Sequence, residues 1–262
     1  MSSSGVQLQW LGQSSFLLGS PEGRIGVDLY LSDHLAAKYR GTDKPHDRLH
    51  GCPATPEDLR DLSWVFASHR HSDHLDPGSI AQVLEQATAA TLVLPAPLVD
   101  YAATELGVPR DRMRGVVAGD RVGPFLAIPA AHPDVTPACL SVLIEVGGLR
   151  VFHSGDTLCF DEQRELLREL RPDVVLLPAN GRVASHLGTP PNMSLEEAVD
   201  LARDCEAALL IPHHYDLFAF NARPVDDVRR VLSDSGVPHL VMTVGETVDL
   251  GQVLAAAAVA SV

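Results

Sequence analysis

The sequence predicts a single α/β domain over residues 1–262, with a strand-rich beginning and a helix-rich second half. Three observations predict this class: alternating apolar residues at the start, a succession of apolar runs and helical patterns later, and no repeat or linker between them. Since 45% of the residues are hydrophobic and 21% are charged, the composition is that of a globular chain with a sizeable core.

The first thirty residues are expected to form an antiparallel meander. Val6, Leu8 and Trp10 alternate with their neighbours, and short apolar runs follow at 15–18 and 24–28, separated by glycine and proline. The pattern breaks over residues 33–56, where basic side chains and histidines mix with glycine and proline. We interpret this stretch as a long polar loop, and such loops are usually functional or mobile.

Strands and helices are expected to alternate over the rest of the chain. Apolar runs predict strands at 64–67, 91–94, 126–130, 140–146, 149–153, 174–177, 208–211 and 239–243. Helical patterns lie between them at 77–86, 96–106, 161–170, 194–204 and 225–235. Ser194 and Glu197 have the spacing of a capping box, and Pro109 and Pro172 each follow a predicted helix end. The run of alanines at 255–258 is the one low-complexity stretch.

Charge and composition limit the classes of partner that we expect for this protein. The formal net charge of −14 argues against a nucleic-acid partner, because such binding needs a basic surface, whereas excess carboxylate suits divalent cations. No apolar stretch is long enough for a membrane span, and the first residues do not resemble a secretory signal. Four widely spaced cysteines fit reduced thiols. We therefore expect a cytoplasmic protein that acts on a small molecule, and the sequence leaves a homo-oligomer open.

The strongest motif is His-Arg-His-Ser-Asp-His at residues 69–74, directly after a predicted strand. At about 100° per residue on a helix, or with the alternation of a strand, its four metal-binding side chains cannot point at one atom. On an irregular loop, two of the histidines can face one ion while Asp73 and His74 face another. The motif therefore predicts a pair of metal ions, about 3.5 to 4 Å apart, of the kind that activates a water.

Two ions need more ligands than one loop supplies. His132, Asp156 and His214 each follow an apolar run that ends in a turn. Strand ends are where open sheets place their sites, because the scaffold there is rigid and the backbone is free to curve. We expect these three side chains to complete the site.

The order of these residues resembles the metallo-β-lactamase superfamily, from about residue 6 to residue 250. Four segments look like the branch that contains L-ascorbate-6-phosphate lactonase: Trp10-Leu-Gly-Gln-Ser-Ser-Phe-Leu-Leu18, Phe152-His-Ser-Gly-Asp-Thr157, Leu177-Pro-Ala-Asn-Gly181 and Ile211-Pro-His-His-Tyr-Asp-Leu-Phe218. The resemblance implies a four-layer αββα fold in which two mixed β-sheets are sandwiched between helices.

The resemblance also implies the ligand sets, which are His69, His71 and His132 for one ion, and Asp73, His74 and His214 for the other. Asp156 would bridge the two ions. His214 is preferred to His213 because the ligand of the family is the histidine two residues after the proline. Both zinc and manganese occur in this branch, so the expected cofactors are two divalent ions, Zn or Mn.

Several further side chains are assigned roles. Asp73 is expected to be catalytic as well as a ligand, by orienting the attacking water or taking up its proton. Asp28 ends a strand near the opening meander, and is our candidate to accept a hydrogen bond from a histidine ligand. The residues expected to contact the substrate are Asn180, Arg182, Arg40 and Tyr215. Arg40 and Arg48 belong to a basic loop that is either an ordinary solvated loop or a lid whose cations meet an anionic group.

The expected activity is metal-dependent hydrolysis of a lactone, or a related ester or amide, in a small phosphorylated or anionic substrate. The alternative is a phosphodiesterase or nuclease with the same dinuclear site, against which the net charge of −14 weighs. An oxygen-reducing di-iron protein would need a flavin domain that 262 residues cannot hold. A non-catalytic binding module is expected to have lost ligands, whereas all seven positions are filled here.

Overall fold

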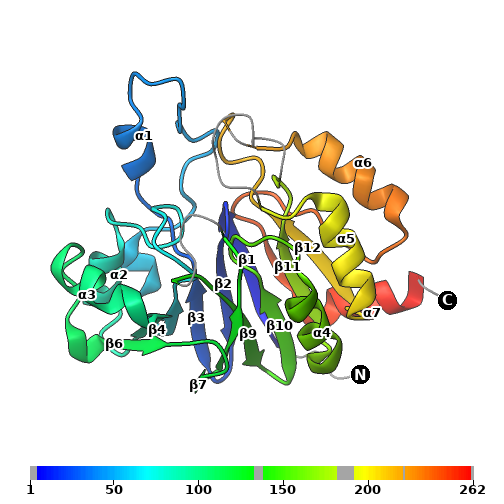
Figure 1. Ribbon diagram of the computed structural model, residues 1–262, viewed down its shortest axis with the longest axis horizontal. Helices are drawn as coiled ribbons and strands as arrows, with labels where there is room; N and C mark the ends of the chain where they lie inside the picture. The colour runs from blue at the N-terminus through cyan, green and yellow to red at the C-terminus, as the bar shows by residue number, and fades with distance from the viewer. Residues whose placement is uncertain (1–4, 133–137, 182–191, 221, 261–262) are drawn as a thin grey trace.

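Two mixed β-sheets packed face to face form the centre of the protein, and helices cover their outer faces (Figure 1). The structure, a computed structural model, describes residues 5–132, 138–181, 192–220 and 222–260. The layers confirm the αββα architecture that the resemblance implied.

The first sheet has seven strands. They are β1 (Gln7–Gly12), β2 (Ser15–Ser20), β3 (Gly23–Val27), β4 (Leu62–Phe66), β5 (Thr91–Pro95), β6 (Met113–Val116) and β13 (Thr247–Asp249), in the spatial order β13-β1-β2-β3-β4-β5-β6. The strands β1, β2 and β3 pair antiparallel, which confirms the predicted meander. From β3 to β6 the pairing is parallel, so the carboxyl ends of these strands share one edge of the sheet.

The second sheet has six strands. They are β7 (Arg121–Val122), β8 (Phe125–Pro129), β9 (Leu140–Val146), β10 (Leu149–His153), β11 (Val174–Pro178) and β12 (Leu209–His213), in the spatial order β12-β11-β10-β9-β8-β7. The strands β10, β11 and β12 are parallel, and β7 to β10 are antiparallel. The carboxyl ends of β10, β11 and β12 therefore also meet at one edge.

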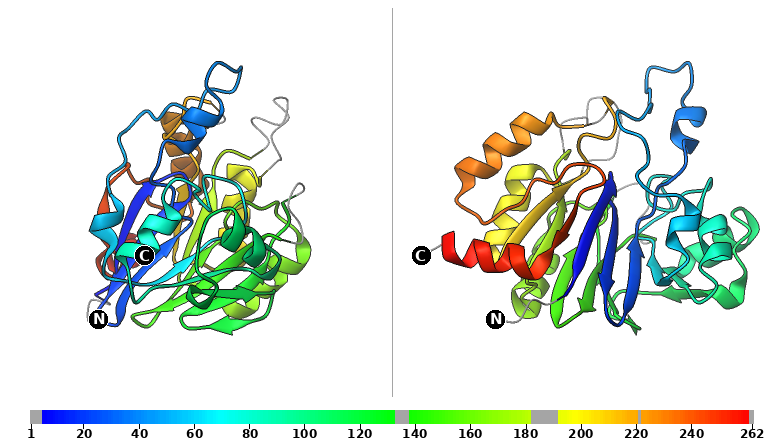
Figure 2. Two further views of the ribbon diagram at one scale, coloured as in Figure 1. Left: turned by 90° about the vertical axis from the view of Figure 1, so that its left-hand side faces the viewer. Right: turned by 180° about the vertical axis from the view of Figure 1, so that it is seen from behind.

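Seven α-helices complete the described fold. They are α1 (His34–Lys38), α2 (Ile80–Gln86), α3 (Val99–Thr104), α4 (Asp161–Leu170), α5 (Leu195–Asp204), α6 (Val225–Ser235) and α7 (Leu250–Ala260). The helices α2 and α3 flank the first sheet, α4, α5 and α6 flank the second, and α7 follows β13 at the edge of the first sheet (Figures 1 and 2). Short 3₁₀ helices lie at Pro56–Leu59, Ala96–Leu98 and Arg110–Arg112. In the described part of the chain, no helix has the length and apolar character needed to cross a bilayer.

Strand alternation builds two hydrophobic layers on the first sheet. Phe16 and Leu18 point into the main core between the sheets, and Leu17 points to the other face. Similarly, Phe66 joins the main core while Val65 packs with the apolar residues of α2 and α3. Because both faces of this sheet are covered, its strand ends are held rigidly at the edge where the polar loops emerge.

Most of the predicted elements are confirmed, and two predictions need correction. The apolar run at 239–243 is not a strand, because within the described ranges it makes only one β-bridge, from His239 to Leu210, before the Thr243–Glu246 turn. The alanine-rich stretch, for which no element was predicted from the sequence, lies in α7, since a run of alanines is a good helix former. The helix predicted at 77–86 begins at Ile80 because the carboxylate of Asp76 accepts hydrogen bonds from the Gly78 amide and the Ser79 hydroxyl.

Candidate metal centre

The predicted ligands meet at one edge of the sandwich, where strands of both sheets end. The loop at 69–74 follows β4, and the other three ligands follow β8, β10 and β12. This edge lies at the top of Figure 1, beneath the excursion that carries α1. The structure thus brings together all seven side chains that the sequence assigns to metal binding, which are His69, His71, Asp73, His74, His132, Asp156 and His214.

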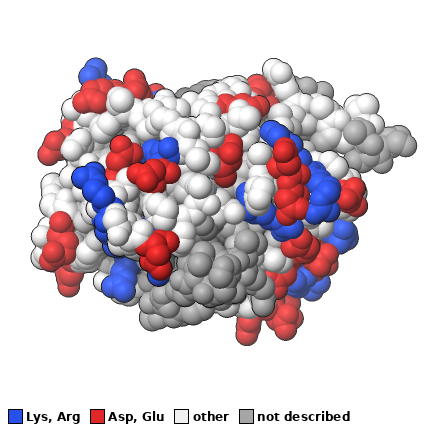
Figure 3. Space-filling view, turned by 90° about the horizontal axis from the view of Figure 1, so that it is seen from above, with Lys and Arg blue, Asp and Glu red and all other residues white. Residues whose placement is uncertain are grey.

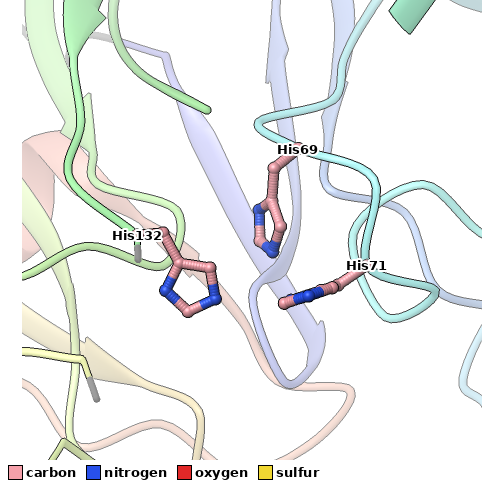
Figure 4. A group of neighbouring side chains, drawn as sticks. All are labelled: His69, His71 and His132. Atoms are coloured by element: carbon pink, nitrogen blue, oxygen red, sulfur yellow. The ribbon is translucent and has the colours of Figure 1, made fainter. Parts of the chain in front are cut away.

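Three histidines form the first group of candidate ligands. The ring centroids of His69 and His71 are 4.6 Å apart, and each lies 5.1 Å from the ring of His132. One nitrogen of each ring lies within 4.8 Å of the others, and the three rings converge in Figure 4. Burial, with the neighbouring His74, holds the pKa of His69 well below its usual value, so this ring is neutral. Neutral imidazole is the form that binds a divalent ion.

Asp73, His74 and His214 form the second group. One oxygen of Asp73 lies 3.9 Å from His74 Nε2 and 3.6 Å from His214 Nε2. Donor atoms that share an ion tetrahedrally at about 2.0 to 2.1 Å are separated by about 3.4 Å, which is longer than a hydrogen bond. The observed separations therefore suit atoms arranged around a common ion.

Asp156 lies between the two groups. Its Oδ1 is 3.5 Å from His74 Nε2, and its Oδ2 is 3.4 Å from His214 Nε2. It also forms a cluster with His69 and His74 in which one ligand atom of each residue lies within 4.8 Å of the others. Its carboxylate is therefore placed to contact ions in both groups.

Unpartnered polar atoms test whether these residues fit metal ions. His69 Nε2, His74 Nε2 and Asp156 Oδ1 are fully buried and have no hydrogen-bond partner among the residues that the structure describes. A buried polar atom without a partner is costly and rare. Three such atoms at the convergence of imidazoles and carboxylates fit divalent cations, because the donor set is the one that zinc and manganese use.

Asp28 binds the Nδ1 nitrogen of His74, in agreement with its predicted role as the acceptor for a histidine ligand. Its Oδ2 lies 2.7 Å from His74 Nδ1 and accepts from the Ser68 hydroxyl at 2.7 Å, while its Oδ1 accepts from the Ser68 amide at 2.7 Å. Burial alone would lower the pKa of His74, but the carboxylates of Asp156 and Asp28 raise it well above its usual value. With Nδ1 held by Asp28, the remaining nitrogen of His74 faces the centre.

His153 and His213 are buried beside the centre but are not placed as ligands. Their rings stack 5.1 Å apart with an interplanar angle of 2°. His153 Nε2 donates to the Ser14 carbonyl at 2.9 Å, and His213 Nδ1 lies 3.1 Å from the Ser14 hydroxyl. Because these nitrogens are used in packing the strand ends together, the geometry agrees with the choice of His214 over His213.

Backbone geometry at the centre is specialised. Gly155 has φ +57°, and a Cβ there would lie 2.7 Å from the Cβ of Ser68, so only glycine lets the Asp156 turn approach the loop at 69–74. Gln13, Asp28 and His214 have φ values of 48°, 47° and 63°. These values lie in the left-handed region, which costs a residue other than glycine about 1 to 2 kcal/mol. Such strain is typical of functional sites that the surrounding structure holds in place.

Two positioning residues were not assigned a role from the sequence. The buried Asp76 carboxylate accepts five hydrogen bonds, from Leu31 N, Ser32 N, Ser32 Oγ, Gly78 N and Ser79 Oγ. It thereby anchors the end of the loop at 69–74 to the chain that follows Asp28. Gln13, in the turn between β1 and β2, contacts Asp73 and His214. The turn residues around Asp76 gave a weak sequence signal, and Gln13 gave none apart from its place in a family-like segment.

The expected substrate contacts have different outcomes. Asn180, at the end of β11, is buried and its Oδ1 accepts from Asn192 at 3.2 Å, on the same edge as the ligands. Arg40 is exposed on the loop after α1, and Arg182 lies outside the described residues. Tyr215 is a correction: its ring is buried against Trp10, 4.6 Å between centroids, and its hydroxyl donates to the Met242 carbonyl at 2.6 Å.

Arg48 fits neither of the two alternatives, a solvated loop side chain or a lid cation, because it braces the protein internally. Its side chain is 6% exposed and lies over the ring of Tyr30, 4.3 Å from the centroid. Its Nη2 donates to the carbonyls of Tyr30 and Ser32 at 2.9 and 3.0 Å, and its Nε donates to Asp33. The guanidinium therefore ties the loop to residues 30–33, which follow β3, and is not exposed to solvent.

Aromatic rings gather on the loop that the sequence described as polar. His46 stacks on Tyr39 at 4.6 Å and packs against Phe218 and Phe220 at 5.1 and 4.9 Å. The Leu49 amide donates to the Leu217 carbonyl, which ties this loop to the segment after His214. Tyr39, His46 and Phe220 are half-buried, so part of each remains accessible.

Metal uptake is expected to weaken as the pH falls. In the metal-free protein burial lowers the pKa of His214, but the charge of Asp156 outweighs it, and the pKa is raised, as it is for His74. Binding an ion must displace these protons, so affinity should rise about tenfold per pH unit for each proton released. Calorimetric zinc titrations at about pH 6 and pH 8, in buffers of different ionisation enthalpy, measure both quantities. Equal affinity at the two pH values with no proton release would contradict this assignment.

Comparison with known proteins agrees with this geometry. A family model described as a beta-lactamase superfamily domain matches residues 34–215. A UPF0173 metal-dependent hydrolase from Methanoculleus marisnigri is 29% identical over 259 residues, which cover 94% of this chain and 97% of that protein.

Two solved structures share the fold. Igni18, a metallo hydrolase from Ignicoccus hospitalis, superposes with a TM-score of 0.66 at 21% identity, covering 93% of this chain and 97% of its own. The metallo-beta-lactamase fold protein YhfI from Bacillus subtilis gives 0.65 at 16% identity, covering 93% and 98%. The chain belongs to the metallo-β-lactamase superfamily and is a metal-dependent hydrolase of that superfamily.

Proposed function

We propose that this hydrolase opens a lactone, or cleaves a related ester or amide, in a small molecule, and that it uses two divalent ions, zinc or manganese. The observation that carries the two-ion part is the position of Asp156 between the three-histidine group and the Asp73–His74–His214 group. The lactone part is supported by the segments that resemble the L-ascorbate-6-phosphate lactonase branch.

The side chains of this centre are proposed to have different roles in hydrolysis. When bound, two divalent ions supply an activated water and polarise the bond under attack. Asp73 is the more accessible of the two carboxylates, with 16% of its side chain exposed against 8% for Asp156. The charges of His74 and His214 outweigh burial and lower the pKa of Asp73, so it is ionised at neutral pH and can orient the attacking water. Gln13 and Asp28 hold these groups in place.

The substrate side is proposed to combine a polar edge with an aromatic wall. Asn180 follows β11, and the half-buried rings around His46 pack against the segment that follows His214. Arg40 and Arg182 are the proposed contacts of an anionic or phosphorylated group on the substrate. Arg48 is not proposed for this role, because its donors are largely used within the protein.

A small-molecule substrate also suits the charge distribution. Seen from above, the described part of the face mixes acidic and basic side chains, with many uncharged residues between them (Figure 3). Together with the net charge of −14, this pattern lacks the basic stripe that a nucleic-acid backbone requires. No observation on the described residues favours the phosphodiesterase or nuclease alternative.

A substrate panel tests the proposal. Protein loaded with zinc or manganese is assayed against a phosphorylated sugar lactone, an unphosphorylated lactone, p-nitrophenyl acetate and bis-p-nitrophenyl phosphate. We expect kcat/KM for a lactone or the ester to exceed that for the phosphodiester by about tenfold or more, and to collapse in His71→Ala. A faster phosphodiester reaction, or lactone turnover that persists in His71→Ala, would reject it.

The compartment is proposed to be the cytoplasm. Cys52, Cys139, Cys159 and Cys205 are all free thiols. Unpaired cysteines are typical of proteins kept in a reducing environment.

A further inference from the structure

Gln13 occupies an unusual position in the turn between β1 and β2. Its backbone is left-handed, with φ 48°, and its side chain is buried, with the residue 3% exposed. Glutamine gains nothing locally from this conformation, unlike glycine or asparagine. A strained residue with a buried amide beside a metal centre is held there by its contacts, and these contacts indicate what it does.

The side chain and the main chain of Gln13 reach two members of the second ligand group. The amide Nε2 donates to Asp73 Oδ2 at 3.1 Å and lies 3.3 and 3.4 Å from the two ring nitrogens of His214. The Gln13 carbonyl accepts from the His214 amide at 3.0 Å and from Trp10 Nε1 at 2.9 Å. Because an ionised carboxylate only accepts, the nitrogen of the amide must be the atom that faces Asp73.

These contacts join residues that are distant in the sequence. Asp73 belongs to the loop after β4 in the first sheet, and His214 to the loop after β12 in the second. Gln13 bridges the two loops across the mouth of the sandwich, and Trp10, buried in the main core, fixes the Gln13 carbonyl. Gln13 thus contacts both Asp73 and His214.

We infer that Gln13 is a positioning residue that sets the affinity of the Asp73–His74–His214 group for its ion. By donating to one oxygen of Asp73, it orients the carboxylate, and through its carbonyl it fixes the backbone of His214. Removing a residue that orients a ligand commonly weakens metal binding by about 10- to 100-fold. Gln13 has this role only if the two-ion part of the proposed function holds.

The test compares metal binding by Gln13→Met, Gln13→Ala and the wild type. Methionine keeps the length of the side chain without a donor, and alanine removes the side chain, so an effect of packing on one variant does not decide the outcome. Gln9→Met, in β1 of the same hairpin, is the matched control, because the Gln9 amide donates to the Gly245 carbonyl and not to a ligand. Zinc binding is followed by calorimetry and by elemental analysis after dialysis against a weak chelator.

We expect the wild type and Gln9→Met to bind two ions, and the Gln13 variants to bind one with wild-type affinity and one about 10- to 100-fold more weakly. The kcat of the Gln13 variants should be low at limiting zinc and should return toward the wild-type value in excess zinc. A general loss of structure would not allow this recovery. Equal weakening of both ions, or affinities within about twofold of the wild type, would overturn the role of Gln13. Binding of fewer than two ions by the wild type would instead refute the two-ion proposal itself.

Discussion

Asp156→Ala is expected to lower turnover on the order of a thousandfold or more. The carboxylate of Asp156 contacts both His74 and His214 and lies between the two ligand groups, so its loss affects both ions. Burial raises the pKa of Asp156, but the charges of His214 and His74 outweigh it and keep the pKa well below its usual value, so the side chain is a carboxylate at working pH. The measurements are kcat/KM and metal content by elemental analysis.

The control for this variant is Asp234→Ala, on the exposed surface of α6. It removes a carboxylate from the protein without touching the centre, so activity and metal content should match the wild type. Asp156→Ala protein that retains both ions, or turns over within about tenfold of the wild type, would contradict the bridging position.

Asp28→Ala is expected to lower the free energy of unfolding of the metal-free protein by about 3 to 5 kcal/mol. The substitution leaves His74 Nδ1 and both donors of Ser68 buried without their acceptor. Alanine in the left-handed conformation of residue 28, φ 47°, adds backbone strain. Denaturant unfolding followed by circular dichroism measures the change.

Asp61→Ala is the matched control for stability. The Asp61 side chain is 67% exposed, and its ion pair with Arg24 is a surface pair, which contributes at most about 1 kcal/mol. If Asp28→Ala were no more destabilising than Asp61→Ala, Asp28 would not be the buried partner that holds His74.

The architecture was largely predictable because apolar periodicity reports burial. The strands at Leu140–Val146 and Leu149–His153 and the helix at Val225–Ser235 were predicted with the bounds that the structure has. The run at 239–243 was misassigned because apolar character does not distinguish a paired strand from a chain that packs beside one. Which strands become neighbours, such as β13 with β1, depends on contacts far apart in the sequence and left no local signal.

The convergence of the seven candidate ligands was predictable because each lies on a loop that follows an apolar run, where open sheets place their sites. The substrate side was not, since an arginine that braces main-chain carbonyls, as Arg48 does, has the same sequence signal as one that awaits an anion. Tyr215 was misassigned for a similar reason: its position next to His214 did not reveal that its ring packs in the core against Trp10. The role of Gln13 was not predictable from the sequence, because its partners, Asp73 and His214, lie far along the chain.

Two ions on either side of Asp156 are proposed to be held by His69, His71 and His132 and by Asp73, His74 and His214. X-ray diffraction at the absorption edge of the metal, from crystals of zinc- or manganese-loaded protein, tests this central claim most directly. Two anomalous peaks about 3.5 to 4 Å apart among these seven side chains are predicted. A centre with no peak, or with ions bound only elsewhere on the protein, would contradict the claim.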